Sequence, residues 1–433
     1  MTQMESARKG IITEAMCVVA QVEQVPLETV RVAVAEGSAV IPLNHHHAHC
    51  HPVGVGRLFS TKINANLGRS PVRSNQNDEL AKLAVALEAG ADFVMDLSTG
   101  DDVYAIRQRM LDVSTQPLGT VPVYEAISRL NDDIPLLQPQ FLLEIIRAQA
   151  EQGVDFMTLH AGLLLRHIPL AMNRKMGIVS RGGSIMAEWM MANQTENPLY
   201  THWDEVLEIL AEHDVTVSLG DGMRPGCLAD ASDAAQFAEL DVLGDLVERC
   251  RRRGVQVMVE GPGHLPFDQI QMNMEREQRV CKGAPFYVLG PVVTDIAPGY
   301  DHLVSAIGAT AAATYGASLL CYVTPAEHLG LPDLNEVRQG CIAYRIAAHA
   351  ADVARHHPGA QQRDDAMAEA RAAFDWERQF GLALDSQHAK QRWLQTRSCV
   401  DGTHTDDHCS MCGKAFCAVR TSHRIQHLME KQK

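Results

Sequence analysis

The sequence predicts an α/β protein whose main part is a (β/α)8 barrel of the TIM type, followed by a C-terminal helical region and a flexible tail. Two observations predict the barrel. Short apolar runs alternate with amphipathic helices from about residue 61 to residue 330, and polar side chains follow nearly every apolar run. Eight or so alternations match the size of such a barrel. A doubly wound open sheet is the alternative, but no G-x-G-x-x-G sequence follows the first strand.

The periodicity divides the chain into four expected parts. They are an N-terminal helical segment with a histidine-rich loop (1–60), the catalytic barrel (61–332), a helical region (333–398) and a tail with three cysteines (399–433). The expected helices of the barrel include 78–90, 141–152 and 233–253. The expected strands are short and apolar: 62–66, 92–97, 119–124, 155–160, 177–180, 215–221, 256–260, 286–290 and 318–323.

Composition and charge indicate a cytoplasmic enzyme. With 433 residues, 46% of them hydrophobic, the chain can bury a large core. The formal net charge of −15 argues against nucleic acid as a partner, because its recognition needs a dense basic face. No apolar run is long enough to span a membrane, and the N-terminus lacks the apolar core of a secretory signal. Eleven cysteines without a tidy pairing fit a reducing compartment.

Polar residues stand at the ends of the expected strands. In a barrel these ends converge on one mouth, where such enzymes do their chemistry. A single tyrosine or histidine there is more often a packed core residue, but ten such sites in register favour a functional site. They are Asn66, Met95–Asp96, Tyr124, His160, Ser180–Gly183, Asp221–Arg224, Glu260, Tyr287, Asp295 and Glu327–His328.

Two of these segments indicate ligand contacts. Ser180-Arg-Gly-Gly183 is a glycine-rich turn before an expected helix, and its N–H groups and hydroxyls suit a phosphate. Glycine pairs also occur in ordinary turns. Asp221 and Arg224 flank Gly222 and offer an acceptor and a fork-shaped donor to a small polar ligand. The alternative is a structural ion pair.

The segment Glu260-Gly-Pro-Gly-His264 presents a carboxylate and an imidazole on one tight turn. A second imidazole, His328, follows a later strand. Two histidines on one face of a barrel can hold a metal ion with open positions for substrate. The alternative is that one histidine is a general base and the other is structural.

Near the C-terminus, Cys409-Ser-Met-Cys412-Gly-Lys-Ala-Phe-Cys417 has C-x2-C-x4-C spacing. Three thiolates at this spacing can hold three irons of a [4Fe–4S] cluster and leave the fourth open to S-adenosylmethionine. The other interpretations are a zinc knuckle completed by His404 or His408, and reduced thiols in a flexible tail.

The most specific motifs are spread over most of the chain. They are INANLG (63–68), DLSTG (96–100), GTVPVY (119–124), HAGLLLR (160–166), IVSRGGSIMA (178–187), SLGDGMRPG (218–226), EGPGH (260–264), TDIAPGYDH (294–302), LCYVTPAEHLGLP (320–332), AAHAADVA (347–354) and CSMCGKAFC (409–417). On these motifs the chain resembles the phosphomethylpyrimidine synthase family of non-standard radical S-adenosylmethionine enzymes. The resemblance implies a (β/α)8 barrel and a homodimer in which the cluster-binding tail of one subunit serves the barrel of the other.

The resemblance also implies ligands and roles. Cys409, Cys412 and Cys417 would hold the [4Fe–4S] cluster, with S-adenosylmethionine as cofactor and a low-potential electron donor as partner. His264 and His328 would hold a second divalent metal, zinc or iron. Glu260 and His160 would move protons. The residues implied to contact the substrate, 5-aminoimidazole ribotide, are Asn66, Met95, Tyr124, His160, Ser180, Arg181, Gly182, Asp221, Gly222, Met223, Arg224, Glu260 and Tyr287.

Enzymes of this family make one of two products. One is 4-amino-5-hydroxymethyl-2-methylpyrimidine phosphate for thiamin. The other is 5-hydroxybenzimidazole, made by a radical carbon–carbon lyase for the lower ligand of cobamides such as cobalamin. The chain is short, resembles the long pyrimidine synthases internally, and has unusual residues at His45–His51 and Arg69, which we expect near the barrel mouth. These features favour 5-hydroxybenzimidazole. The alternatives from other classes are a zinc-dependent barrel hydrolase and a catalytically silent paralogue that binds a nucleotide.

Overall fold

The computed structural model describes residues 1–70, 75–397, 408 and 411–432. By its internal contacts the chain divides into two compact units, residues 1–355 and residues 356–433. The finer division at residues 60, 332 and 398 stays a prediction.

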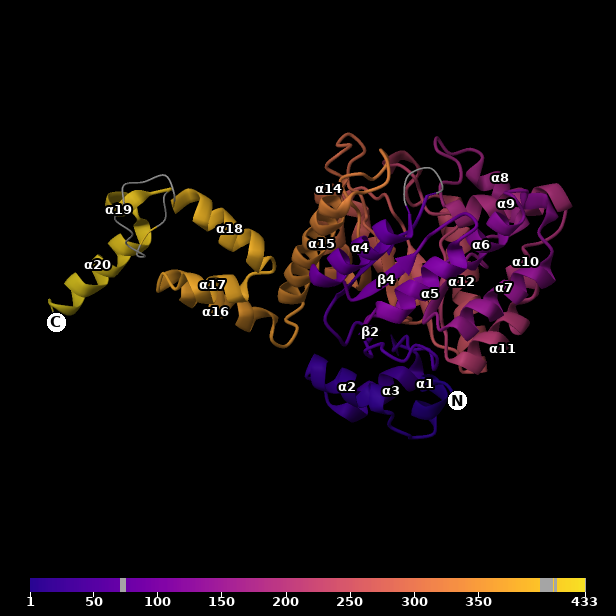
Figure 1. The fold of residues 1–433 in the computed structure, drawn as a ribbon, viewed down its shortest axis with the longest axis horizontal. Coiled ribbons are helices and arrows are strands. Elements are labelled where there is room, and N and C mark those ends of the chain that lie inside the picture. Colours follow the sequence, from indigo (N-terminus) through magenta and orange to yellow (C-terminus); the bar gives the residue numbers. More distant parts are fainter. Residues whose placement is uncertain (71–74, 398–407, 409–410, 433) are drawn as a thin grey trace. The chain divides into compact units, whose positions relative to one another are not determined.

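The first unit is built on a closed barrel of parallel strands, which confirms the predicted (β/α)8 fold (Figure 1). Each strand pairs with the next along the chain, and the last pairs with the first, with Leu319 opposite Lys62 and Cys321 opposite Asn64. The barrel strands are β3 (Lys62–Leu67), β4 (Phe93–Asp96), β5 (Leu118–Thr120), β6 (Phe156–Leu159), β7 (Thr216–Leu219), β8 (Val257–Gly261), β9 (Phe286–Leu289) and β10 (Ala317–Cys321).

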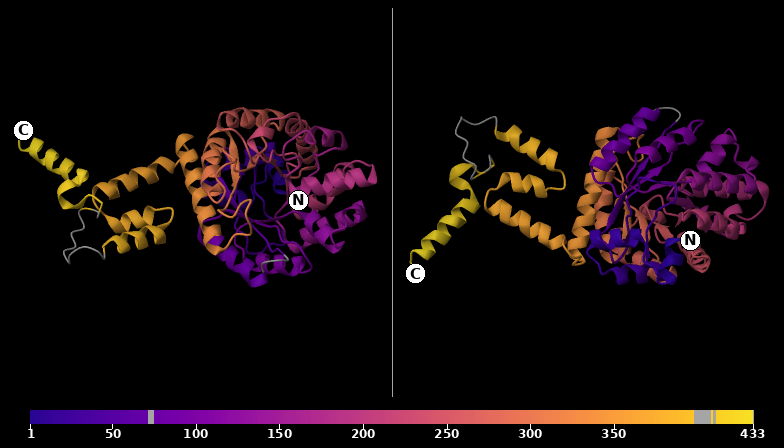
Figure 2. Two further views of the ribbon diagram at one scale, coloured as in Figure 1. Left: turned by 90° about the horizontal axis from the view of Figure 1, so that it is seen from above. Right: turned by 60° about the horizontal axis from the view of Figure 1, so that its bottom comes forward.

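Helices surround these strands, as the view along the barrel in Figure 2 shows. They are amphipathic: α12 (Ala234–Arg253) buries Leu243 and Val247, exposes Arg252 and Arg253, and is followed by Gly254 in the left-handed conformation. The α-helices that follow β3 in this unit are, besides α12, α4 (Gln76–Glu88), α5 (Val103–Val113), α6 (Pro122–Arg129), α7 (Pro139–Gln152), α8 (Ile168–Ala171), α9 (Arg181–Asn193), α10 (Pro198–Thr201), α11 (Trp203–His213), α13 (Ile270–Val280), α14 (Asp301–Tyr315) and α15 (Leu334–Ala354). Short 3₁₀ turns are η1 (Ile134–Leu136), η2 (Leu165–His167), η3 (Leu228–Asp230) and η4 (Phe267–Gln269).

Two expected strands differ from the structure. The expected strand at 177–180 is wrong: these residues lead into α9, and Ser180 caps that helix by accepting a hydrogen bond from the N–H of Gly183. The expected strand at 119–124 stops at Thr120, because Pro122 opens helix α6. Tyr124 therefore lies on a helix and not on a strand.

The N-terminal residues cover the end of the barrel where the strands begin. Thr2 donates from Oγ1 to the carbonyl of Gly254 at 2.6 Å, and the N–H of Gln3 donates to Asp214 at 2.8 Å. Gly254 and Asp214 directly follow the helices that lead into β8 and β7. The elements of this layer are α1 (Gln3–Arg8), α2 (Glu14–Glu23), α3 (Leu27–Glu36) and the antiparallel pair β1 (Ala39–Val40) and β2 (Val55–Gly56).

The second unit is helical in its described residues. The ring of Trp393 packs against those of Trp376 and Phe380, each with centroids 5.5 Å apart. Its helices are α16 (Ala360–Ala372), α17 (Trp376–Leu382), α18 (Ser386–Arg397), α19 (Gly413–Phe416) and α20 (Ala418–Glu430). Across the described parts of both units, no helix combines the length and apolarity that a bilayer crossing requires.

Candidate active site

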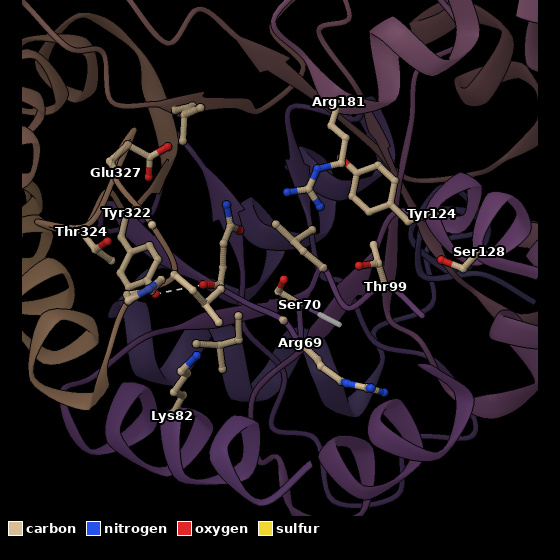
Figure 3. Close-up of a pocket in the computed structure, with 18 of the residues that line it drawn as sticks. Arg69, Ser70, Lys82, Thr99, Tyr124, Ser128, Arg181, Tyr322, Thr324 and Glu327 are labelled. Carbon is tan, nitrogen blue, oxygen red and sulfur yellow. Dashed lines mark hydrogen bonds between the residues drawn. The ribbon is translucent and has the colours of Figure 1, made fainter. Parts of the chain in front are cut away.

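The C-terminal ends of the barrel strands surround two adjoining cavities of about 70 and 640 Å³. Asn66, Tyr124 and Arg224 line both. Figure 3 shows Arg181 beside Tyr124 on one wall of the larger cavity, with Glu327 on the opposite side. The expected site residues that line the smaller, inner cavity are Asn66, Met95, Tyr124, His160, Asp221, Arg224, Glu260 and Tyr287.

Four of the residues expected to contact the substrate line neither cavity and lie behind the cavity walls. They are Ser180, Gly182, Gly222 and Met223. Gly182 leaves room for His160, because a Cβ atom at Gly182 would lie 2.2 Å from Cε1 of that ring. Gly183 and Gly222 pack backbone to backbone in the same way. These glycines therefore let α9 approach the strand ends closely.

An amide and thiol network joins β3 to β9 and β10. Asn64 donates from Nδ2 to Oδ1 of Asn66 and to the hydroxyl of Tyr287, both at 2.7 Å. Asn66 donates to Sγ of Cys321 at 3.0 Å. Burial raises the pKa of Cys321 to about 12, so its thiol is protonated at neutral pH. The sequence interpretation missed Asn64 and Cys321, although Asn64 stands two residues before Asn66 and so shares its face of the strand.

Glu260, at the end of β8, is the carboxylate of the inner cavity. The hydroxyls of Thr158 and Ser218 both donate to its Oε1, at 2.7 and 2.8 Å. Burial raises the pKa of Glu260 despite these two donors. A carboxyl group with a raised pKa exchanges protons more readily near neutral pH, which suits an acid or a base.

His160, just after β6, is a neutral imidazole. Its Nε2 lies 3.1 Å from Oγ of Ser180, while its Nδ1 is buried without a protein partner in the described structure. Burial and the charge of Arg224 lower the pKa of His160 to about 3. At neutral pH the ring is therefore uncharged and can orient a ligand through hydrogen bonds.

Asp221 and Arg224 form an ion pair of 3.0 Å at the wall of the inner cavity. Burial raises the pKa of Asp221 to about 7, although Arg224 opposes this change. Oδ2 of Asp221 is buried and has no protein partner in the described structure. The pair thus leaves both an acceptor and a cation for a ligand.

Two side chains outside the cavity hold the Asp221–Arg224 segment in place by hydrogen bonds to the backbone of Met223. Oε2 of Glu239 accepts from its N–H at 2.7 Å, and Nη2 of Arg174 donates to its carbonyl at 2.8 Å. Arg174 is itself fixed by a two-pronged contact with Asp233, at 2.6 and 2.7 Å. The sequence interpretation missed Glu239, Arg174 and Asp233, because no local pattern shows which backbone a distant side chain supports.

His264 and His328 come together, as their predicted role as metal ligands requires. Their ring centroids are 5.4 Å apart. Nδ1 of His264 lies 3.0 Å from Asp295, and Nδ1 of His328 lies 3.2 Å from Asp301. Carboxylates on Nδ1 are the usual support of histidines that bind a metal through Nε2. The pair therefore fits a divalent ion, although no third ligand group completes the set among the described residues.

The His45–His51 segment does not lie near the mouth, so that expectation is wrong. His47 contacts Asp155, which directly precedes β6, and the carbonyl of Ser114 at the C-terminus of α5. Both partners mark the end of the barrel where the strands begin. Arg69 does lie at the mouth, where it lines the larger cavity and pairs with Asp102 at 3.1 Å.

The cysteine motif lies in the second unit. Cys412 is exposed and Cys417 is buried, and both are free thiols at the N-termini of α19 and α20. Cys409 and His404 lie outside the described residues.

Comparison with known proteins gives a consistent family. Residues 2–424 match the family model described as the radical SAM ThiC family. A phosphomethylpyrimidine synthase of Halobacterium salinarum is 58% identical over 421 residues, which are 97% of this chain and 88% of that protein. Another, of Natronomonas pharaonis, is 59% identical over 419 residues, 97% of this chain and 87% of that protein. Among solved structures, a dihydropteroate synthase of Coxiella burnetii matches with a TM-score of 0.41 and 13% identity, over 68% of this chain and 94% of that one.

These relatives correct the expected product. The expectation of 5-hydroxybenzimidazole synthase, a carbon–carbon lyase for cobamide synthesis, is wrong, because relatives matched over 97% of the chain are phosphomethylpyrimidine synthases. That expectation depended on both His45–His51 and Arg69 lying at the mouth of the barrel, and of the two only Arg69 lies there. The segment lies at the opposite end and cannot act on how a substrate fragments.

The clamp on Met223 gives a first prediction. The pKa of Glu239 is raised by burial to about 8 from an ordinary 4.5, so the folded chain holds a proton that the unfolded chain releases. Stability should therefore fall as pH rises between these two values. Glu239→Gln, which keeps an acceptor but cannot titrate, should make this slope shallower, and the remaining slope comes from other buried carboxyls such as Asp221. Glu239→Ala should cost about 1–3 kcal/mol by leaving the N–H of Met223 unpaired. Denaturant unfolding across this pH range measures both effects, and an unchanged slope in Glu239→Gln would contradict the assignment.

Proposed function

The chain belongs to the radical SAM ThiC family, and on that premise we propose that it is a phosphomethylpyrimidine synthase. It would rearrange 5-aminoimidazole ribotide to 4-amino-5-hydroxymethyl-2-methylpyrimidine phosphate for thiamin synthesis. The observation that carries the proposal is the identity of 58% and 59% to synthases of this name over 97% of the chain. The polar inner cavity at the strand ends supports it, since a small ribotide needs donors and acceptors on several sides.

Membership of a radical SAM family implies a [4Fe–4S] cluster and S-adenosylmethionine. The donor set fits the cluster, because thiolates are its usual ligands and Cys412 and Cys417 are free thiols. With Cys409 they would hold the cluster. When bound, the cluster and S-adenosylmethionine supply the radical that starts the rearrangement.

We propose that the ribotide lies across the inner cavity and the adjoining larger cavity, and that α9 orients its phosphate. Arg181, the first residue of α9, lies over the ring of Tyr124 at 5.0 Å and projects into the larger cavity. A cation at a helix N-terminus favours an anion there. Ser180 would act through the cap that fixes this helix end. Remote phosphate binding of this kind helps to position the reacting ribose.

Proton transfer is assigned to Glu260. Its raised pKa and its place in the inner cavity suit a group that gives or takes a proton during the rearrangement. His160, held neutral, would orient the ligand and Ser180. We expected both residues to move protons, but of the two only Glu260 has a pKa that is shifted toward neutrality.

The second metal, zinc or iron, is proposed at His264 and His328, whose carboxylate partners hold the two rings in place. Such an ion would bind amino or carboxylate groups of a ligand.

A homodimer is also proposed, with the cysteine tail of one subunit serving the barrel of the other and a low-potential protein as electron donor. Exposed apolar side chains on α14, Leu303 and Ile307, with Tyr300 just before it, support a contact surface on the barrel.

The product tests the proposal directly. Under nitrogen, the reconstituted protein with aminoimidazole ribotide, S-adenosylmethionine and a strong reductant should yield the methylpyrimidine phosphate, identified by mass spectrometry. Rescue of a thiamin auxotroph by the gene for this chain would also support the proposal. A colourless, zinc-loaded protein that is active in air and makes no deoxyadenosine would overturn the proposal in favour of a hydrolase.

A second experiment separates binding from proton transfer. Ser180→Ala should mainly raise the apparent KM for the ribotide. It removes the cap of α9 and so weakens the contact of this helix with the phosphate, which exists before the reaction. Glu260→Gln should mainly lower kcat, by about 10²-fold or more for a lost general acid or base. Steady-state kinetics measure both. Equal effects of the two changes on KM and kcat would refute this division of roles.

A third experiment tests the shared site. Cys417→Ala should abolish deoxyadenosine formation, and Glu260→Gln should lower turnover, when each variant is alone. If the tail serves the partner's barrel, mixed subunits of the two variants should regain part of the activity, because one barrel then meets one intact tail. Cys250→Ala, a buried cysteine outside the motif, is the control and should stay active with a loss of about 1 kcal/mol of stability. Mixtures no better than the sum of their parts would contradict the exchange.

A further inference from the structure

The proposed function leaves the His45–His51 segment without a role. His47 and Cys50 lie beside Asp155 at the end of the barrel opposite the two cavities. One potential ligand atom from each lies within 4.8 Å of the others. His47 and Asp155 are buried and Cys50 is half-buried. We propose that His47, Cys50 and Asp155 bind a divalent transition metal ion, with Zn²⁺ as the natural occupant, that clips the N-terminal layer to the barrel.

The backbone arranges the first two ligands. The N–H of Cys50 donates to the carbonyl of His47 at 3.3 Å, so the segment from His47 to Cys50 is a β-turn. A turn of this length brings its first and last side chains close together. Zinc sites use the same x2 spacing between paired ligands.

Contacts behind the ligands fix their orientation. Nε2 of His47 lies 3.2 Å from the carbonyl of Ser114, which leaves Nδ1 facing Oδ2 of Asp155 at 2.7 Å. A histidine ligand commonly donates its other N–H to a backbone carbonyl in this way. Asp155 accepts from the N–H groups of Asn44 at 2.9 Å and Leu118 at 2.7 Å, so its carboxylate is also held.

The competing occupant of the cluster is a proton. Burial, the largest single influence, lowers the pKa of His47, but the hydrogen bond and the charge of Asp155, together with backbone carbonyls, outweigh it and raise the pKa. An imidazolium–carboxylate pair therefore satisfies both groups without a metal. That pair does not need a thiol, yet a ligand atom of Cys50 lies within 4.8 Å of those of His47 and Asp155. Among the described residues, its thiol makes a weak contact, at 3.5 Å, with the carbonyl of His51. A neutral imidazole, a carboxylate and a thiolate together would neutralise a divalent ion in this buried place.

A cobalt titration tests the site with a signal that only a thiolate ligand gives. The full-length chain with Cys409, Cys412 and Cys417 all replaced by Ala keeps cobalt off the tail, and the His264–His328 pair contains no sulfur. Co²⁺ should then produce a thiolate-to-cobalt absorption band at one ion per chain, and excess Zn²⁺ should remove it. Zn²⁺ should also raise Tm, because a ligand of the folded state stabilises it.

Matched variants decide between a metal and a proton. Cys50→Ala leaves the His47–Asp155 pair in place, so the chain should fold. It should lose the band and the part of the rise in Tm that does not come from Zn²⁺ at His264 and His328. His46 lies in the same segment, but its ring contacts His213 at 3.2 Å, outside the cluster. The variant His46→Gln should therefore keep both the band and the rise in Tm. A parent chain without a thiolate band, or a band that survives Cys50→Ala, would overturn the proposal and leave a simple ion pair.

Discussion

The closure of the parallel ring, where β10 pairs with β3, is the constraint on which the rest of the structure depends. This pairing places Cys321 opposite Asn64 and so brings together groups more than 250 residues apart, as in the contact of Asn66 with Cys321. Residues at or just after the ends of the other strands then line the same inner cavity. Without closure, the same side chains would be spread along the open edge of a twisted sheet.

Burial sets the charge of this cavity. Arg224 is its fixed cation, whereas burial raises the pKa values of Asp221 and Glu260 and lowers that of His160. The carboxyl groups therefore lose negative charge more easily than they would in water, and the imidazole adds no positive charge. A site with one firm cation and carboxyls near their titration range suits an anionic substrate that must also exchange protons.

Much of the fold could be predicted because apolar runs of strand length and amphipathic helices are local patterns. The same local reasoning fails at 177–180, an apolar run with no neighbouring strand to pair with, and at Tyr124, which Pro122 shifts onto a helix. For the site, residues at strand ends such as Glu260 could be predicted from topology alone. Glu239 could not, because its role depends on a tertiary contact with the backbone of Met223. The place of His45–His51 could not be predicted either, since a loop without periodicity gives no sign of which end of a barrel it covers.

The N-terminal layer depends on residues that are synthesised much later. Thr2 and Gln3 form hydrogen bonds with Gly254 and Asp214. Helices α1 to α3 therefore cannot pack on the end of the barrel until β7 and β8 have been synthesised. Met16 and Val30 pack in an apolar cluster formed by residues 7–59 alone, so they can be buried early. Val40 and Val55 belong instead to the core of the barrel, and at about 5–20 residues per second they wait for tens of seconds before that core is complete. During synthesis the N-terminal layer therefore exposes the apolar side chains that face the barrel. The yield of the chain in a cell should depend on chaperones that hold the first sixty residues until the ring can close.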